Sequence, residues 1–289
     1  DRHLLQTVAA QAGLALENAE LLQNLTAEVA QRERISREIE IAREVQERLF
    51  PQSCPQIPGV DLAGYCRPAQ VVGGDYYDYF ALPSPSDHSS SGNDGRLAIA
   101  LGDISGKGIA AALLMASLRA SLRSIAGRQQ GDLASLIHRV NNLVYESSTS
   151  NRYATFFYAE YDPATHLLTY VNAGHNPPAI LRGPESISLE ATGTVVGLLP
   201  NAEYAQATLL LHPGDVLLAY TDGISEAMTR DDEEWGEDRM IAAARHLLAK
   251  PDRTHTARQL LEGILQTADK FTAGAPQQDD MTLLVCAIT

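Results

Sequence analysis

The spacing of apolar residues along this chain changes near residue 59. Between residues 3 and 50 there is one glycine and no proline, and apolar residues recur at a heptad-like spacing. The recurring positions are Leu14, Leu21, Leu25, Ile35, Ile39, Ala42 and Leu49, and the polar residues Arg32 and Gln46 interrupt them. This pattern predicts one long, coiled-coil-like helix, which ends where Pro51, Pro55 and Pro58 follow in quick succession.

From Gly59 onward the apolar runs are short or alternate with polar residues, which is typical of β-strands. These runs are "DLAGYCRPA", "DYYDYFAL", "RLAIALGD", "YATFFYAEYD", "LLTYVNAG", "PAILRG", "ATLLLHPG", "DVLLAYTDG" and "MTLLVCAIT". The turn sequences "DPATHL" (162–167) and "HPGD" (212–215) predict antiparallel hairpins. The polar stretch 83–95, "PSPSDHSSSGNDG", is expected to be a mobile hairpin loop without function.

Helical patterns occupy residues 109–126, 133–147, 238–249 and 256–273. The strands therefore come in runs and the helices in pairs. This order predicts an α+β fold rather than alternating βαβ units.

Composition narrows the class of protein. The chain has 289 residues and a formal net charge of −14, which argues against nucleic acid or an anionic membrane as the main partner. Its three cysteines, Cys54, Cys66 and Cys286, form no CxxC pair, which favours a reducing compartment. The sequence pattern predicts neither a signal peptide nor an apolar run of membrane-spanning length, so we expect a cytoplasmic protein without membrane insertion.

Aspartates recur where apolar strands meet glycine-containing turns. Asp75, Asp103, Asp222 and the pair Asp279 and Asp280 all occupy such positions. One such aspartate is usually a turn former or a helix cap, but carboxylates that gather inside a protein need a compensating cation. Few lysines or arginines neighbour these motifs, so the pattern favours Mg²⁺ or Mn²⁺, which prefer oxygen ligands. The spacing alone leaves open whether the positions converge.

A phosphate-binding glycine loop is the rival interpretation of "LGDISGKGIAAA". It fits poorly, because Gly108 rather than serine or threonine follows Lys107, and no dinucleotide fingerprint is present. Lys107 at the helix start is either a solvated lysine, which we favour, or a group that steers a phosphoryl ligand. Asp103 is therefore better explained as a metal ligand.

The motifs "GGDYYD", "LGDISGKGIAAALLMA", "YATFFYAEYDPATHLLTYVNAGHNPP", "HPGDVLLAYTDGISEA" and "DDMTLLV" closely resemble the bacterial SpoIIE/RsbU-type phosphatases, which belong to the metal-dependent PPM, or type 2C, group. The resemblance covers residues 46–289. Residues 1–24 resemble the closing helix of a GAF sensor domain, and residues 25–58 resemble a helical linker that dimerises. We therefore expect a phosphatase domain over residues 59–289.

The resemblance implies a four-layer α/β-β/α sandwich with two mostly antiparallel sheets, and two Mn²⁺ or Mg²⁺ ions at one edge. Asp103 resembles the ligand that bridges both ions, with the carbonyl of Ile104 on one of them. Asp75 matches the acidic residue of the first motif. Asp222 and Asp279 resemble the remaining ligands, and Asp280 matches a neighbouring position that often does not ligate.

In the reaction that the resemblance implies, metal-activated water attacks the phosphorus, with Asp103 and Asp75 as the catalytic carboxylates and Gly106, Lys107 and Asp280 in supporting roles. One departure is Ser105, where eukaryotic relatives have a histidine proposed as general acid. Arg67 is a weak candidate for the missing phosphate-binding arginine. We interpret His175 as a turn histidine rather than an acid.

The resemblance also implies regulation and a partner. The helices over 109–126 and 133–147 are expected to act as a switch that includes Gly108, Leu113 and Met115, biased by homodimerisation of the N-terminal helix. The implied substrate is a phosphoserine or phosphothreonine on a STAS-type anti-sigma-factor antagonist. The alternatives are an inactive phosphatase-like signalling module and a small-molecule phosphatase.

Overall fold

The structure is a computed structural model that describes residues 2–82, 95–127, 131–148, 152–249 and 256–289. The loop expected over 83–95 therefore lies outside the described residues, apart from Gly95. The chain divides into two compact units, Asp1–Val45 and Gln46–Thr289, and each is described here by itself.

The first unit is helical. It consists of most of α1 (Arg2–Glu47), which confirms the predicted long N-terminal helix. Leu14, Leu21 and Leu25 of the apolar seam are exposed along it. An isolated helix gains little from exposed leucines, so this face lacks the burial that stabilises most helices.

The second unit contains two five-stranded sheets, and every pairing between named strands is antiparallel. One sheet has the order β1-β10-β9-β6-β7, with bounds Val60–Arg67, Met281–Ile288, Val216–Tyr220, Ala179–Arg182 and Glu185–Ser188. The other has the order β2-β3-β4-β5-β8, with bounds Tyr76–Leu82, Arg96–Ile104, Ala154–Asp162, Leu167–Ala173 and Ala207–Leu210.

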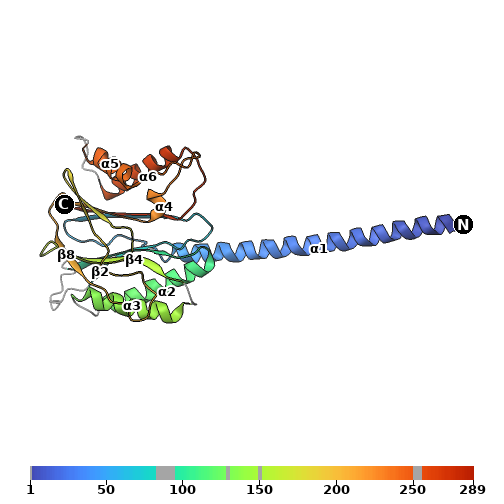
Figure 1. Cartoon of the computed structure of the whole chain (residues 1–289), viewed down its shortest axis with the longest axis horizontal. Coiled ribbons are helices and arrows are strands. Elements are labelled where there is room, and N and C mark those ends of the chain that lie inside the picture. The colour runs from blue at the N-terminus through green and yellow to red at the C-terminus, as the bar shows by residue number, and fades with distance from the viewer. Residues whose placement is uncertain (1, 83–94, 128–130, 149–151, 250–255) are drawn as a thin grey trace. The chain divides into compact units, whose positions relative to one another are not determined.

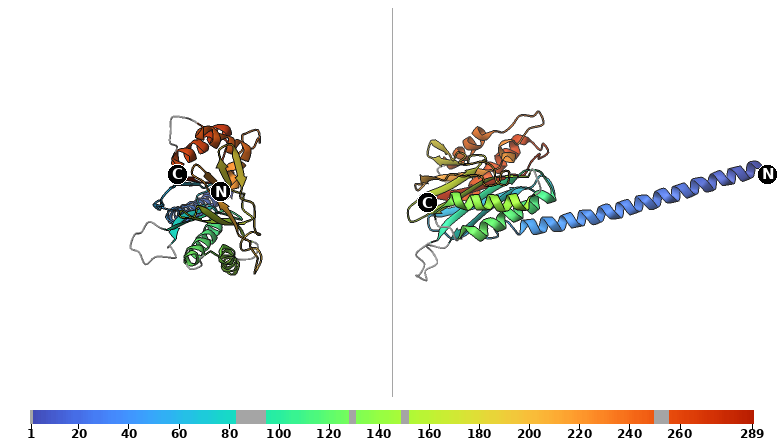
Figure 2. Two further views of the ribbon diagram at one scale, coloured as in Figure 1. Left: turned by 90° about the vertical axis from the view of Figure 1, so that its left-hand side faces the viewer. Right: turned by 60° about the horizontal axis from the view of Figure 1, so that its bottom comes forward.

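Two helices cover the outer face of each sheet (Figures 1 and 2). Helices α2 (Ile109–Ala126) and α3 (Leu133–Ser147) pack on the β2–β3–β4–β5 face, while α5 (Glu237–Leu248) and α6 (Ala257–Thr272) pack on the β1–β10–β9 face. A short helix, α4 (Asp222–Ser225), follows β9. The expected four-layer α+β sandwich is thus confirmed.

Alternation along β3 shows how the sequence builds the layers. Ala98 and Ala100 face α2 and α3, where small side chains let the helices approach. Leu97, Ile99 and Leu101 point the other way into the cluster between the two sheets. Since both faces of this strand are covered, its residues from Leu97 to Leu101 are all apolar. The next charged residue along the strand is Asp103.

Helix α2 departs from one expectation. By length and composition it is apolar enough to cross a membrane, contrary to the expectation that no such run exists. Its buried residues, among them Met115, Leu118 and Leu122, form part of the core against the sheet. A third of this helix (33%) is buried inside the domain, while the apolar residues Ile109 and Leu113 are exposed.

One of the two predicted hairpins is correct. β4 and β5 pair antiparallel across the Asp162–Leu167 turn, as "DPATHL" predicts. The hairpin at "HPGD" is wrong, because β8 pairs with β5 in one sheet and β9 pairs with β10 and β6 in the other. β8 is partly exposed along its length and occupies a sheet edge, whereas all five residues of β9 are buried and need neighbours on both sides.

Asp215 holds this crossing between the sheets. Its carboxylate accepts hydrogen bonds from Arg182 Nη2 (2.6 Å) and Nε (3.0 Å) and from the backbone N–H of His212 (2.8 Å). Burial by itself would raise the pKa of Asp215, but these hydrogen bonds and the charge of Arg182 outweigh burial and lower the pKa.

We expect Asp215→Asn to reduce the free energy of unfolding by about 2 kcal/mol at neutral pH, because a buried charge-assisted pair is lost. Since the folded-state pKa is lowered, the contribution of the carboxylate is present above the ordinary aspartate pKa and is lost as the pH falls through the folded value. Urea unfolding from neutral to acid pH should show the gap between wild type and variant closing.

The matched control for this prediction is Asp162→Asn, at the exposed turn of the correct hairpin, where the carboxylate accepts one backbone hydrogen bond. An Asp215→Asn effect no larger than that of Asp162→Asn, or a gap that widens in acid, would contradict this account.

Candidate metal centre

Strand pairing brings the predicted aspartates to one edge of the sandwich. Tyr76 pairs with Gly102, so Asp75, just before β2, and Asp103, near the end of β3, lie opposite each other. In the other sheet Tyr220 pairs with Leu283, which places Asp222, after β9, near Asp279 and Asp280, before β10. The topology therefore gathers residues that are up to 205 positions apart along the chain.

Asp75 is the most deeply buried of these carboxylates. Its Oδ2 accepts hydrogen bonds from the hydroxyls of Thr221 (2.8 Å) and Thr282 (2.5 Å), one residue from each of the two strand ends in the opposite sheet. Burial, followed by the charge of Asp103, raises the pKa of Asp75 well above its ordinary value despite these hydrogen bonds. The two hydroxyls fix the orientation of the carboxylate and occupy only one of its oxygens.

Asp103 lies where the other carboxylates meet. Burial, followed by the charges of Asp222, Asp279 and Asp280, raises the pKa of Asp103 to about 7, and Lys107 opposes this rise. Burial and Asp279 also raise the pKa of Asp222. This edge of the protein is therefore short of positive charge.

Asp279 and Asp280 have different surroundings. The carboxylate of Asp280 is buried and accepts from the backbone N–H groups of Ala69 (2.8 Å) and Gly74 (2.6 Å). The carboxylate of Asp279 is about half exposed, with Oδ2 3.0 Å from the ammonium of Lys107. Asp280 thus anchors the loop before β2, while Asp279 remains available to an external ligand.

The loops at this edge pack closely through glycine. A Cβ at Gly74 would lie 2.9 Å from the carbonyl oxygen of Ile104, and one at Gly73 would lie 2.5 Å from Asp280 Oδ2. Gly106 adopts φ +93°, which favours glycine. The carbonyl oxygen of Ile104 therefore faces the loop that carries Asp75. The family resemblance implies that this carbonyl is a metal ligand.

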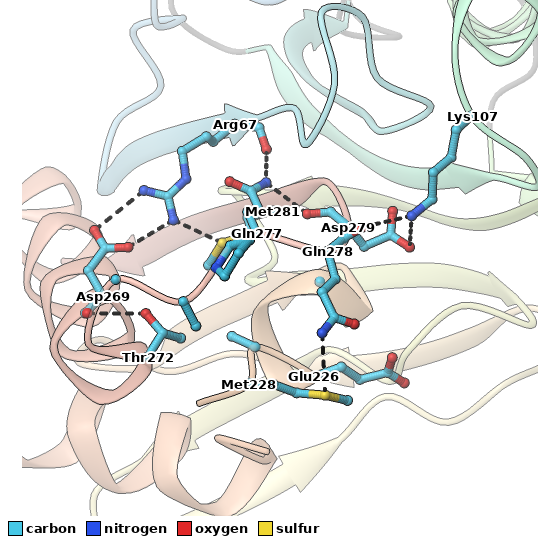
Figure 3. Close-up of a pocket in the computed structure, with 15 residues that line it drawn as sticks. Arg67, Lys107, Glu226, Met228, Asp269, Thr272, Gln277, Gln278, Asp279 and Met281 are labelled. Atoms are coloured by element: carbon cyan, nitrogen blue, oxygen red, sulfur yellow. Dashed lines mark hydrogen bonds and ion pairs between the residues drawn. The ribbon is translucent and has the colours of Figure 1, made fainter. Parts of the chain in front are cut away.

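Lys107 is half exposed to solvent and also contacts two oxygen atoms. Its ammonium forms the ion pair with Asp279 and donates to the carbonyl of Gln278 at 2.7 Å (Figure 3). Both residues line a cavity of about 490 Å³ whose walls include Met228, Met281 and Gln277. The cavity therefore opens directly beside the aspartate cluster.

The donor chemistry of this edge fits a hard divalent cation. Only oxygen donors are offered by Asp75, Asp103, Asp222, Asp279 and the Ile104 carbonyl, and the raised pKa values show that positive charge is missing. Within the described ranges, no three His, Cys, Asp or Glu side chains stand close enough together to form a ready cage. Mg²⁺ commonly binds through one or two carboxylates and keeps several waters, so such a cage is not required.

Three further residues from the sequence analysis serve as supports. Ser105 Oγ accepts from the backbone N–H of Tyr153 (2.9 Å). Arg67 forms a bidentate pair with Asp269, which occupies its guanidinium. His175 is buried beside the hydroxyl of Thr155, with a ring N–O distance of 2.9 Å, and burial lowers its pKa to about 4. This surrounding fits the turn-histidine interpretation.

The expected switch residues lie at the start of α2. Gly108 has φ +82° and directly precedes the helix, Leu113 is exposed, and Met115 is fully buried. Gly108 and Met115 therefore connect the Asp103 loop to the core, whereas Leu113 presents an apolar side chain to solvent.

Gln46 was not among the predicted site residues. It is buried, its Nε2 donates to the carbonyl of Gly73 (2.7 Å), and its Oε1 accepts from the N–H of Gly73 (3.0 Å). Gln46 thus clamps the loop that leads to Asp75. In the sequence, the only feature that marks Gln46 is that this polar residue interrupts the apolar seam of the helix.

The fold matches that of a solved phosphatase domain. The SiaA-PP2C domain of Pseudomonas aeruginosa superposes with a TM-score of 0.72 at 19% identity, over 90% of this chain and 98% of that one. A family model described as Stage II sporulation protein E (SpoIIE) matches residues 93–289. The chain belongs to this SpoIIE family of PP2C-type serine/threonine phosphatase domains.

Two relatives are similar over most of the chain. Protein IcfG of Synechocystis sp. is 29% identical over 86% of this chain, and the phosphoserine phosphatase RsbU of Bacillus subtilis is 28% identical over 94%. The chain spans 41% of IcfG and 75% of RsbU.

The different surroundings of the two adjacent aspartates predict different effects of neutralisation. In metal-free protein, Asp280→Asn should lower the free energy of unfolding by about 2 kcal/mol, because the amide NH₂ replaces one of the two oxygens that accept from the backbone N–H groups of Ala69, Gly74 and Asp75. Asp279→Asn should leave it within about 0.5 kcal/mol, since the ion pair with Lys107 is half exposed and like charges surround it. Urea unfolding in EDTA measures both, and equal losses in the two variants would contradict the assignment.

Proposed function

We propose that this domain hydrolyses phosphoserine or phosphothreonine on a regulatory protein, using two Mn²⁺ or Mg²⁺ ions. The observation that carries the proposal is the convergence of Asp75, Asp103, Asp222 and Asp279 at one edge, with raised pKa values at the first three. Membership of the SpoIIE family supports the same chemistry.

The roles of the residues are assigned from their surroundings and from the family resemblance. Asp103, which interacts with the carboxylates of both sheets, would serve both ions. Asp75, oriented by Thr221 and Thr282, would help to hold one ion together with the Ile104 carbonyl, and Asp222 and Asp279 would help to hold the other. Bound there, the ions would supply a water acidic enough to attack phosphorus and would neutralise charge on the phosphoryl oxygens.

Neither of the two side chains considered as general acids, Ser105 and His175, is suited to donate a proton to the leaving serine. Ser105 has an aliphatic hydroxyl, which is far too weak an acid near neutral pH and accepts from the backbone N–H of Tyr153, and His175 is buried, with a pKa low enough to keep it neutral at pH 7. Neither group meets the requirement for a general acid near neutral pH. We therefore propose that solvent at the open edge delivers this proton.

A protein substrate is favoured over a small molecule. The cavity beside Asp279, of about 490 Å³, is large enough for a side chain or for a small ligand, so this preference comes from the relatives. RsbU, a relative over most of the chain, is named a phosphoserine phosphatase. A STAS-type anti-sigma-factor antagonist, the substrate that the resemblance implies, fits this class.

We expect Asp103→Asn to reduce Mn²⁺-dependent turnover of p-nitrophenyl phosphate and of a phosphoserine protein by roughly 10³-fold or more, because the shared ligand is lost. Asp162→Asn, which also removes one carboxylate charge, should retain wild-type turnover. Wild-type turnover in Asp103→Asn would contradict the proposal. If the wild-type chain hydrolyses p-nitrophenyl phosphate but no phosphoprotein, the result favours the small-molecule alternative.

We further propose that α1 regulates the domain as part of a homodimer. Its exposed apolar residues Leu14, Leu21, Leu25 and Ile35 repeat at a spacing suited to a second copy of the same helix. This arrangement would bury apolar surface that the single chain leaves in water.

Light scattering should therefore find the full chain dimeric and a chain that begins at residue 45 monomeric. Two substitutions on the seam, Leu21→Glu and Leu25→Glu, should also dissociate the dimer, whereas Glu20→Gln and Glu33→Gln, which lie away from the seam, should not. A dimer that survives removal of residues 1–44 would rule out this helix as the interface.

A further inference from the structure

Lys107 provides the one basic side chain that pairs with any of the five edge aspartates, among the residues that the structure describes. Its Nζ lies 3.0 Å from Asp279 Oδ2 and 2.7 Å from the carbonyl oxygen of Gln278. A carboxylate and a backbone carbonyl are the oxygen types that a hard divalent cation takes. The ammonium therefore holds two oxygens of the kind that a metal ion would use (Figure 3).

The loop that carries Lys107 can withdraw it. Gly106 and Gly108 flank the lysine, with φ values of +93° and +82°. A Cβ at Gly108 would meet nothing closer than 3.9 Å, so the loop is not tightly enclosed on that side. Glycines on both sides give the backbone the freedom to move the side chain without rearranging β3 or α2.

The ion pair is also easily displaced. The side chains of Lys107 and Asp279 are 44% and 46% exposed, so solvent screens their attraction. The pair spans the two sheets, since Lys107 follows β3 and Asp279 precedes β10. It keeps the loops of the two sheets together while leaving the carboxylate accessible.

From this geometry we infer that Lys107 is a resident cation that competes with a divalent ion for Asp279. In the metal-free protein the ammonium partly neutralises the edge and holds the two loops together. Loading of the ion that uses Asp279 requires the lysine to leave, and so the lysine weakens that site. The inference rests on the proposed metal binding and assigns to Lys107 a positioning role that is distinct from steering a phosphoryl group.

The test counts Mn²⁺ bound to the full chain, from the electron paramagnetic resonance signal of free Mn²⁺ and from calorimetry. Lys107→Gln roughly keeps the length of the side chain and removes its charge. At the site that uses Asp279, the variant should bind Mn²⁺ roughly three- to fivefold more tightly than wild type. Lys107→Arg should stay within about twofold of wild type, because the charge remains. The Lys107→Gln gain should shrink between about 0.05 M and 0.5 M salt, since screening weakens the competing pair.

Lys270→Gln is the matched control, because it removes one lysine charge in the last turn of α6, beside a different cavity. It should leave Mn²⁺ binding unchanged. Melting temperatures in EDTA establish that each variant is folded.

Three results would overturn the inference. Unchanged Mn²⁺ affinity in Lys107→Gln, with a raised KM for phosphoprotein, would show that the lysine binds substrate instead. Weaker Mn²⁺ binding in Lys107→Gln would show that the lysine builds the metal site rather than competing for it. A wild-type chain that binds no Mn²⁺ would overturn the proposed function itself, and the inference with it.

Discussion

Repulsion between carboxylates at one edge of the sandwich is the constraint on which the site depends. Asp103 is largely buried and lies within the influence of Asp222, Asp279 and Asp280, which together with burial raise its pKa to about 7. Such an arrangement costs free energy unless a cation compensates it. The edge tolerates the repulsion because two hydroxyls hold Asp75 and backbone N–H groups hold Asp280.

The rest of the fold keeps these groups in place. Each sheet contributes one pair of strand ends, and the apolar layer between the sheets fixes their separation. Asp280 joins β10 to the loop before β2, and Gln46 clamps the same loop through Gly73. The edge is therefore enclosed at Asp75, whose carboxylate is buried, and open to solvent at Asp279 and Lys107, which are half exposed.

Much of this architecture could be predicted from the sequence. Periodicity located α2 and α3 with their correct ends, and the resemblance supplied the layers and the position of Asp75 and Asp103. Local patterns were insufficient where the outcome depended on distant partners. "HPGD" has the composition of a hairpin turn, but β9 takes its neighbours from β6 and β10. The contact of Lys107 with Asp279, 172 residues away, could not be predicted either, because Lys107 follows a strand of one sheet and Asp279 precedes a strand of the other.

Binding of divalent cations between the aspartates of the two sheets can be seen directly in an anomalous-difference map from crystals of the chain grown with MnCl₂. We expect peaks between Asp75, Asp103, Asp222 and Asp279, with Asp280 still bonded to the backbone and the Lys107 ammonium moved away from Asp279. A map without peaks at this edge, at Mn²⁺ concentrations that support turnover, would contradict it.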